Sequence, residues 1–576
     1  MSIDLEKKSN ELKDFVSQFE SSSFLGELSI LIHFISSSTP ISSLTGLSSP
    51  QRQLIYLAGL NVASRIERPT LKGKFSDGEL TQMKILLNEI EEGYNQFFYP
   101  KPGEMKDQEW QDRRRIAMPY FLSYFNQGDL NYPEQIIERV SEYFTPFDSE
   151  IISKFGISTA EFIDFYKYLF DVPNTFFNDQ IFNKSDEKSW EESIKSIPFG
   201  QISPEQAFSY LPQSDQNLFN WLQDPGKLNQ FKVSDLIQKF GKQKAETFLT
   251  HLTVERIETR FLYYTEKNIL FYKPIFKIDN DTFQILELKL IIQSIYNLLL
   301  DFCIQQPKLK ERFYETRGKK LEDKIEKLFI NFYDEKCFIY KEYFTQDNKG
   351  QDLLIISKGL ALIIEAKSSK RDEPRRDPVM AYPLILSNFE ETIQKGYDQT
   401  YRVKSKFINK QVLNIYKDQD FKNNIINIKT KNYYNVFSII VTLERFGHFQ
   451  TDLNLMLELY EDDEYPISIC IDDLECILLM IKKIGNKKQN LLTDYLRLRE
   501  IMHGRTISSD ELEISGAFLQ GKISYKNFNE NDVYFIGHPD LADIFDHTYK
   551  KTGLGFMNEL NLEQKLSDEY LPFGGI

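Results

Sequence analysis

The sequence predicts a multidomain protein in which a large N-terminal α-helical region is followed by an α/β domain with a central mixed sheet flanked by helices. Three observations support this fold class. The chain has 576 residues, more than a single hydrophobic core usually holds. Apolar residues recur at helical spacing through most of the first 300 residues. Two apolar runs of strand length, Leu353 to Ile356 and Leu360 to Ile364, flank a turn in the later part of the chain.

We expect four regions, because prolines and polar runs interrupt the helical pattern and the long strand-like runs gather in the third region. They are an N-terminal helical region (1–150), a second helical region with a short hairpin (151–304), an α/β domain (305–500) and a small C-terminal region (501–576). In the second region, Lys232 to Leu252 has the pattern of a helical pair, and the apolar runs around Asp279-Asn280-Asp281 predict the hairpin. No motif in the first 300 residues indicates an activity.

Composition indicates a globular, cytoplasmic protein with no membrane partner. The formal charge of −15 argues against a protein that coats nucleic acid with its whole surface. Met1 to Asp14 is too dense in charge for a signal peptide, and the apolar stretch Ile285 to Ile304 contains charged residues, so we expect a buried helix there. The four cysteines lie in apolar contexts without zinc-site spacing, which predicts reduced core residues. The phosphate-loop pattern Gly-x4-Gly-Lys-Ser/Thr does not occur, so nothing supports ATP hydrolysis.

The stretch from Gly350 to Lys367, GQDLLIISKGLALIIEAK, predicts a β-hairpin in a buried sheet, because two apolar runs flank the turn Ser357-Lys358-Gly359. Side chains alternate along a strand, so we expect Glu365 and Lys367 on the same face. The hairpin returns the chain past Asp352, so two carboxylates and one ammonium group are expected to converge. Closely spaced carboxylates suit a hard cation such as Mg²⁺, and a nearby lysine can manage a proton or a phosphate charge.

The pattern D-x12-E-x-K formed by Asp352, Glu365 and Lys367 resembles the metal site of the PD-(D/E)xK nuclease superfamily, which has the restriction-endonuclease-like fold. Gln351 stands where the proline of the superfamily's name would be. The resemblance implies that Asp352, Glu365 and the backbone carbonyl of Ala366 hold one or two Mg²⁺ or Mn²⁺ ions. It also implies that Lys367 orients or deprotonates the attacking water, or stabilises the developing charge.

Two further side chains are carried over from this resemblance, both on helices. The first core helix of the superfamily often supplies an additional carboxylate, and Glu322 matches that position, with Glu326 as the second choice. An exposed glutamate in a surface ion pair is the alternative for Glu322. The helix predicted at Phe389 to Tyr401 resembles the one on which a glutamine often faces the active site. Gln399 is the first choice for that glutamine and Gln394 the second.

The resemblance covers about residues 305–490, where further elements are predicted around the hairpin. A helix beginning near Gly318 and a strand at about Cys337 to Phe344 precede it. Val436 to Leu443 and Pro466 to Ile471 are apolar runs of strand length, and we assign both to the sheet of the hairpin.

Two positively charged stretches follow the hairpin. One is the loop after Lys367, and the other is Arg402 to Lys431, in which eight basic and two acidic residues give 8 − 2 = +6. We expect both to contact a phosphate backbone, and solvated surface is the alternative for each. The residues predicted to bind nucleic acid are Lys370, Arg371, Arg375, Arg376, Arg402, Lys404 and Lys406.

These features predict a Mg²⁺-dependent nuclease that hydrolyses phosphodiester bonds, foremost a DNA endonuclease, with RNA as the alternative substrate. A second hypothesis is a catalytically inactive nucleic-acid-binding or assembly module of a larger defence or repair complex, and a third is an ion-pair cluster without metal. By analogy at the level of fold, a nuclease joined to a large helical region resembles bacterial anti-phage effectors. We therefore expect a homodimer or a partner defence protein.

Overall fold

A computed structural model gives the arrangement of most of the chain. It describes residues 3–35, 44–65, 71–126, 131–176, 178, 190–198, 203–334, 336–346, 350–369, 378–485, 488–530, 533–557 and 559. The described residues form two compact units: the first holds residues up to Gln96 and Tyr132–Cys303, and the second holds Phe97–Asn131 and the described residues from Ile304 onward. The division between Cys303 and Ile304 lies one residue before the expected start of the α/β domain at 305.

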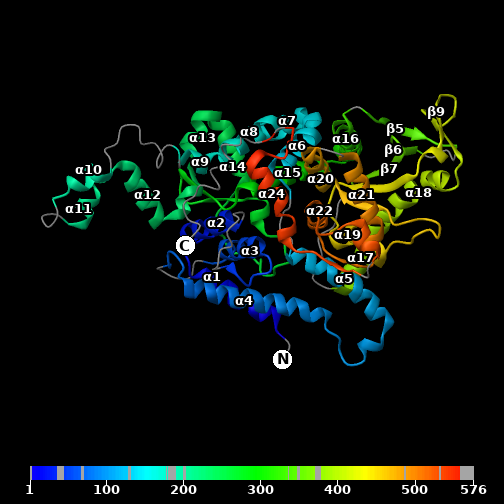
Figure 1. Cartoon of the computed structure of the whole chain (residues 1–576). Helices are drawn as coiled ribbons and strands as arrows, with labels where there is room; N and C mark the ends of the chain where they lie inside the picture. The colour runs from blue at the N-terminus through cyan, green and yellow to red at the C-terminus, as the bar shows by residue number, and fades with distance from the viewer. Residues whose placement is uncertain are drawn as a thin grey trace. The chain divides into compact units, whose positions relative to one another are not determined.

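The first unit is mainly helical, as the sequence predicts (Figure 1). Its helices are α1 (Leu5–Ser17), α2 (Ser21–Ile35), α3 (Pro50–Val62), α4 (Asp77–Asn95), α6 (Pro133–Phe144), α7 (Asp148–Phe155), α8 (Thr159–Phe170), α9 (Val172–Phe176), α10 (Trp190–Lys195), α11 (Pro204–Phe208), α12 (Gln213–Gln223), α13 (Val233–Phe240), α14 (Lys242–Leu252) and α15 (Leu288–Gln305). A four-stranded sheet in the order β1-β4-β3-β2 joins β1 (Gln230–Lys232), β4 (Thr282–Ile285), β3 (Ile275–Lys277) and β2 (Thr253–Val254). The predicted helical pair, α13 and α14, and the antiparallel hairpin of β3 and β4 are both confirmed.

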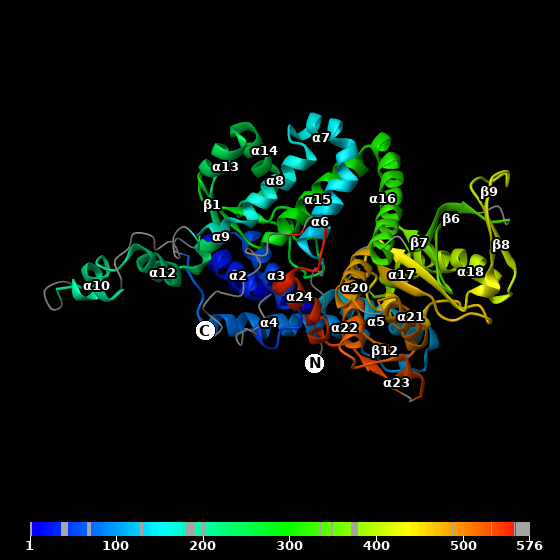
Figure 2. The same cartoon turned by 45° about the horizontal axis from the view of Figure 1, so that its top comes forward.

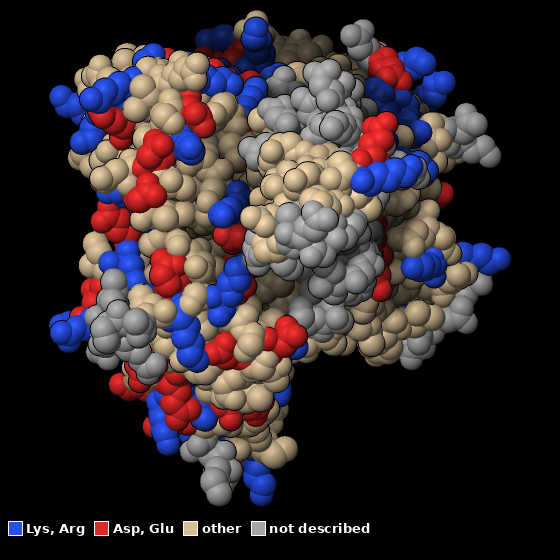
Figure 3. All heavy atoms as spheres, turned by 90° about the vertical axis from the view of Figure 1, so that its left-hand side faces the viewer, with Lys and Arg blue, Asp and Glu red and all other residues tan. Residues whose placement is uncertain are grey.

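Helix α15 contains most of the apolar stretch that we expected to be a buried helix. It is the one described helix that is long and apolar enough to cross a membrane, by length and composition alone. Half of that segment is buried inside the protein. On the face of the protein drawn in Figure 3, lysine and arginine side chains are interspersed with aspartate and glutamate. That face therefore presents charges of both signs rather than a field of one sign.

The second unit is built around a seven-stranded mixed sheet in the order β11-β10-β7-β6-β5-β8-β9. Its strands are β5 (Phe338–Phe344), β6 (Gly350–Ser357), β7 (Leu360–Lys367), β8 (Val412–Tyr416), β9 (Asn424–Lys429), β10 (Asn435–Thr442) and β11 (Ile467–Cys470). β7, β10 and β11 run parallel to one another, and the other pairs, including β6 with β7, are antiparallel. The mixed sheet and the placement of both later strands in it are thus confirmed.

The helices of the second unit include two on opposite faces of this sheet, α16 (Pro307–Tyr333) and α18 (Lys395–Ile408). Lys341 on β5 forms an ion pair with Asp323 on α16, whereas the adjacent Tyr340 packs against the apolar cluster that contains Val403 and Phe407 of α18. Because neighbouring strand residues point to opposite faces, α16 and α18 cover different sides. The remaining helices are α5 (Gln108–Asn126), α17 (Pro378–Phe389), α19 (His448–Thr451), α20 (Ile471–Ile484), α21 (Lys488–Met502), α22 (Glu511–Leu519), α23 (Tyr525–Glu530) and α24 (Asp543–Thr552), with a small parallel pair of β12 (Thr506–Ile507) and β13 (Phe535–Ile536). Figure 2 shows α16 and α18 beside the sheet.

Two segments differ from the predicted order. Helix α5 comes from the N-terminal part of the sequence, yet it packs against α17, and Tyr120 stacks on Phe449 with ring centroids 5.6 Å apart. The segment 412–429, predicted only as a positively charged stretch, forms the β8–β9 hairpin at the end of the sheet. Its alternating apolar residues, as in Val-Leu-Asn-Ile-Tyr, were the signal for strands.

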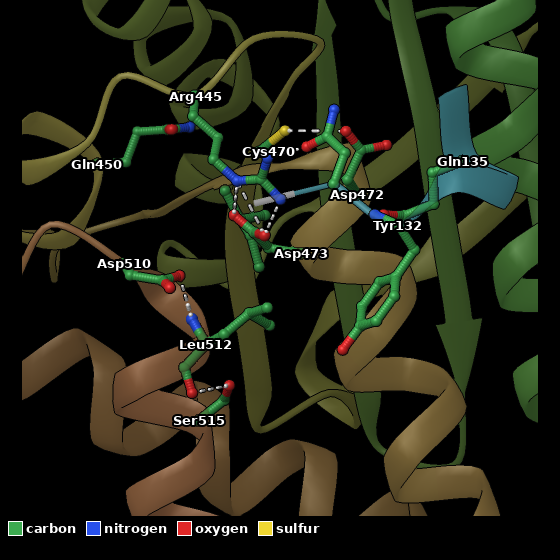
Figure 4. A network of polar contacts seen from close by, with 12 residues as sticks. Tyr132, Gln135, Arg445, Gln450, Cys470, Asp472, Asp473, Asp510, Leu512 and Ser515 are labelled. Atoms are coloured by element: carbon green, nitrogen blue, oxygen red, sulfur yellow. Dashed lines mark hydrogen bonds and ion pairs between the residues drawn. The ribbon is translucent and has the colours of Figure 1, made fainter. Parts of the chain in front are cut away.

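A buried ion pair joins the chain leaving β10 to the first turn of α20 (Figure 4). Arg445 Nε lies 3.1 Å from both carboxylate oxygens of Asp473, and Arg445 Nη2 lies 2.5 Å from Asp473 Oδ1. The side chain of Asp473 is 4% exposed and that of Arg445 is 15% exposed. Such a bidentate pair fixes the relative orientation of its two side chains. Removing one partner leaves the other charge buried without a counter-charge.

We expect Asp473→Ala to lower the free energy of unfolding by about 3–5 kcal/mol, because it leaves a buried guanidinium without its carboxylate. The double variant Arg445→Met/Asp473→Leu should lose less than Asp473→Ala, since it removes the guanidinium together with its carboxylate. Urea denaturation of the three proteins measures both values. A double variant as unstable as the single one would contradict this account.

Candidate active site in the second unit

The β6–β7 hairpin brings the predicted acids together. Leu353 pairs with Ile364, so the residues before and after them, Asp352 and Glu365, stand at the open end of the hairpin. Asp352 Oδ2 accepts a hydrogen bond of 2.7 Å from the backbone N–H of Ala366. The carboxylate of Asp352 is thereby tied to the strand that carries Glu365.

Burial and mutual repulsion shape the charge of this carboxylate pair. Glu365 is 2% exposed. Burial, followed by the charge of Asp352, raises its pKa to about 8, and Lys367 opposes both effects. Burial also raises the pKa of Asp352, against the effect of the Ala366 N–H and the Lys367 ammonium. Two carboxylates that share a poorly hydrated site favour a positive charge between them.

The ammonium group of Lys367 is held from two sides. Its Nζ donates to Glu365 Oε1 at 2.9 Å and to Gln399 Oε1, on α18, at 2.5 Å. Gln399, the first choice from the sequence, therefore reaches the site. Gln394 does not, because its side chain bonds the backbone of Glu458.

The approach of α18 to the strands depends on a glycine. A Cβ placed on Gly396 would lie 2.9 Å from Ile440 Cγ2 on β10 and 3.3 Å from Lys367 Cε. The preceding segment, Glu390–Gln394, is a π-helical turn, an irregularity frequent near functional sites. Close packing at Gly396 is what lets Gln399 reach Lys367.

Glu322 lies close enough to the site to be affected by it. Burial, followed by the charge of Asp352, raises the pKa of Glu322 to about 7, while Lys341 lowers it. Glu326 instead lies 3.6 Å from Lys341 in an ion pair, so the second choice is directed away. Within the described ranges, no three His, Cys, Asp or Glu side chains are grouped to hold a metal ion. Glu322 therefore does not complete a three-carboxylate ligand set with Asp352 and Glu365.

Tyr343 is a residue of the site that the sequence did not reveal. It is fully buried, and burial followed by the charges of Glu365 and Asp352 holds the pKa of its hydroxyl well above the usual value. Its hydroxyl has no hydrogen-bond partner among the described residues. Nothing in the sequence separates this tyrosine from its strand neighbours, so no signal was missed.

The residues predicted to contact nucleic acid differ in their exposure. Lys370, Arg371, Arg375 and Arg376 lie outside the described residues. Arg402 and Lys406 are half-buried on α18. Lys404 corrects the prediction: it is 5% exposed, and its Nζ lies 2.6 Å from Asp463 and 3.7 Å from Glu500. A lysine buried in such ion pairs is not free to meet a phosphate.

One partner of Lys404, Asp463, belongs to an acidic segment, residues 458–464, that lies along α18. Tyr460 stacks on Tyr401 of the helix, with ring centroids 3.9 Å apart and planes 6° apart. The Tyr401 hydroxyl donates to Asp462, and the Tyr397 hydroxyl donates to Asp463. Part of the positive charge predicted for α18 is thus neutralised within the protein.

Glu500 makes stability depend on pH at this ion-pair cluster. Burial raises its pKa to about 7, although Lys404 lowers it, while an unfolded glutamate titrates near pH 4.3. Between these values the unfolded chain releases a proton that the folded protein keeps, so Glu500 lowers stability as pH rises to about 7. Below about pH 4 the residue has no such effect.

We expect Glu500→Gln to gain stability relative to the wild type as pH rises from 4 to 8, by about 3 kcal/mol in the difference of unfolding free energies. Urea denaturation at both pH values measures it. Glu461→Gln, at an exposed position of the acidic segment, is the matched control and should show little change. An equal response of the two variants would contradict the assignment.

The described geometry thus joins Asp352, Glu365, Lys367 and Gln399 directly and places Glu322 nearby. Comparisons with protein-family models, with curated proteins and with solved structures found no match to this chain.

Proposed function

We propose that this protein is a divalent-cation-dependent nuclease that hydrolyses phosphodiester bonds in DNA. One observation carries the proposal: at the end of one hairpin, Asp352 bonds the backbone N–H of Ala366, between Glu365 and Lys367, and the Lys367 ammonium bonds Glu365. Two buried carboxylates with a lysine on the second strand form the arrangement that the PD-(D/E)xK resemblance implies.

The order of elements in the second unit adds support. Helix α16 is followed by three antiparallel strands, β5 to β7, then by α17 and α18, and, after the β8–β9 hairpin, by β10, which runs parallel to β7. With α17 and the β8–β9 hairpin as insertions, this order of helix, three strands, helix and strand is consistent with a restriction-endonuclease-like core. The candidate residues Glu322, Asp352, Glu365, Lys367 and Gln399 lie on its helices and strands, where geometry is held more firmly than on loops.

The donor set fits Mg²⁺ or Mn²⁺. Asp352, Glu365 and the Ala366 carbonyl would hold the ion, and all three supply oxygen, the donor that hard cations prefer. Mg²⁺ usually binds through one or two carboxylates and keeps several waters, so two side-chain ligands suffice. A bound dication would also relieve the repulsion that raises the pKa of Glu365.

The chain's own residues would then carry the remaining chemistry. When bound, the cation supplies positive charge that polarises the phosphodiester and makes water a better nucleophile. Lys367, fixed between Glu365 and Gln399, orients that water, exchanges a proton with it or stabilises the charge developing on phosphate. Gln399 acts through Lys367 by restricting its position, and the buried strands limit access of other water.

The central test is Mg²⁺-dependent cleavage of linear, circular and single-stranded DNA and of RNA. Lys367→Ala and Asp352→Asn should lower cleavage by at least about 100-fold, because they remove a proton-handling group and a cation ligand. Cleavage of circular DNA is expected and would identify an endonuclease. Mn²⁺ titration by calorimetry should show binding to the wild type and much weaker binding to Asp352→Asn.

Lys358→Ala, in the exposed turn of the same hairpin, is the matched control and should cleave at the wild-type rate. Circular dichroism establishes that each variant is folded. Full activity in both Lys367→Ala and Asp352→Asn would rule the proposal out. DNA binding without cleavage by the wild type would favour the inactive binding module, and absence of Mn²⁺ binding would favour an ion-pair cluster.

A second prediction concerns the packing of α18. Gly396→Ala should reduce cleavage about 10- to 100-fold, because the added methyl group pushes α18 away from Ile440 and separates Gln399 from Lys367. Gly78→Ala, at an exposed position in α4 where an added Cβ would make only an ordinary contact of 3.9 Å with Ser76 Oγ, should leave cleavage unchanged. Single-turnover rates with saturating Mg²⁺ measure the effect, and equal rates for the two variants would show that the close approach is not required.

A further inference from the structure

We propose that the β8–β9 hairpin binds the backbone of a DNA duplex and presents it to the active site, an inference that rests on the proposed function and names its substrate surface. β8 and β9 pair with each other over five register positions, whereas β8 joins the rest of the sheet at a single one, Phe344 with Tyr416. The hairpin is thus a two-stranded ribbon that diverges from the sheet. Figures 1 and 2 show β9 at the margin of the second unit.

The hairpin and its flanks expose lysines that lack acidic partners. Five lysines are exposed between residues 410 and 431, and only Lys422 forms an ion pair with a described residue, Asp420. The two acids of this segment leave 5 − 2 = +3, in a protein whose formal charge is −15. The four lysines without an ion pair among the described residues are Lys410, Lys417, Lys429 and Lys431.

The ribbon starts beside the candidate active site. Tyr416 pairs with Phe344, and Phe344 pairs with Gly350, two residues before Asp352. Adjacent strands lie about 4.8 Å apart, so Tyr416 is roughly 10 Å from Gly350, and the exposed Lys417 follows it. Lys429 pairs with Val412 at the other end of β8, about 13 Å further along the ribbon. This separation is too wide for one phosphate group and suits several phosphates of a polyanion.

The exposed side chains of the ribbon favour a duplex over a single strand. Binding of single strands relies on aromatic platforms for stacking bases. The rings of this hairpin, Tyr416 and Phe421, instead pack edge-on against each other, 5.1 Å apart. β9 exposes Ile425 and Asn427, an apolar and an amide group of the kinds that meet base edges in a groove. A two-stranded ribbon also fits the major groove of DNA.

The test uses the full chain carrying Lys417→Gln, Lys429→Gln and Lys431→Gln, compared with Lys336→Gln, Lys522→Gln and Lys551→Gln. The control lysines are exposed and form no ion pair with described residues, so both triple variants change the net charge equally. Fluorescence anisotropy with a 30-base-pair duplex, in Ca²⁺ to prevent turnover, measures binding over a range of salt. The hairpin variant should bind about 10-fold or more weakly, and its slope of log K against log salt should fall by about 3.

Equal affinity and equal salt slopes for the two triple variants would overturn the proposal. A loss confined to single-stranded DNA, or to RNA, would overturn the assignment to duplex DNA. The same measurement in the Lys367→Ala background separates this surface from the chemistry. Wild-type protein that binds duplex through the hairpin without cleaving it refutes the nuclease and not the binding surface. A hairpin variant that cleaves DNA and binds the duplex with unchanged affinity refutes the binding surface and not the nuclease.

Discussion

Two carboxylates that repel each other are held close by the pairing of β6 with β7 and by the hydrogen bond that Asp352 accepts from the Ala366 N–H. The antiparallel ladder between β6 and β7 fixes the register of Leu353 against Ile364, and this register brings Asp352 to the N–H of Ala366. The buried strands provide the stability that keeps the acids in an electrostatically unfavourable place. Protonation, the Lys367 ammonium or a bound cation would each reduce the repulsion between the two carboxylates.

Other elements of the second unit position the side chains around these two carboxylates. β10 lies parallel beside β7 and supplies Ile440, against which Gly396 of α18 packs. Gln399, about one turn further along α18, then holds Lys367. α16 approaches from the opposite face and directs Glu322 toward the same edge. A change at Gly396 therefore affects the carboxylates by way of Gln399 and Lys367.

Local patterns in the sequence were sufficient for the hairpin, the later strands and the helix that carries Gln399, because alternation and apolar runs are properties of short segments. They were not sufficient for Lys404. Lys404 is buried in ion pairs with Asp463 and Glu500, which lie 59 and 96 residues further along the chain. Charge counts along a segment do not reveal such pairings. The β8–β9 hairpin was missed for a different reason: its many lysines and asparagines obscured a period of two that was present.

Helix α5 makes the second unit discontinuous in sequence, and this affects how the unit can fold during synthesis. α5 ends at Asn126, and its partner α17 begins about 250 residues later. At ordinary translation rates of about 5–20 residues per second, the apolar face of α5, with Tyr120 and Phe121, waits on the order of 10–50 seconds for that partner. A fragment beginning at residue 304 would lack this helix altogether and leave the rings of Phe449 and its neighbours uncovered. The second unit is therefore completed by a segment of chain that is made long before the strands of its sheet.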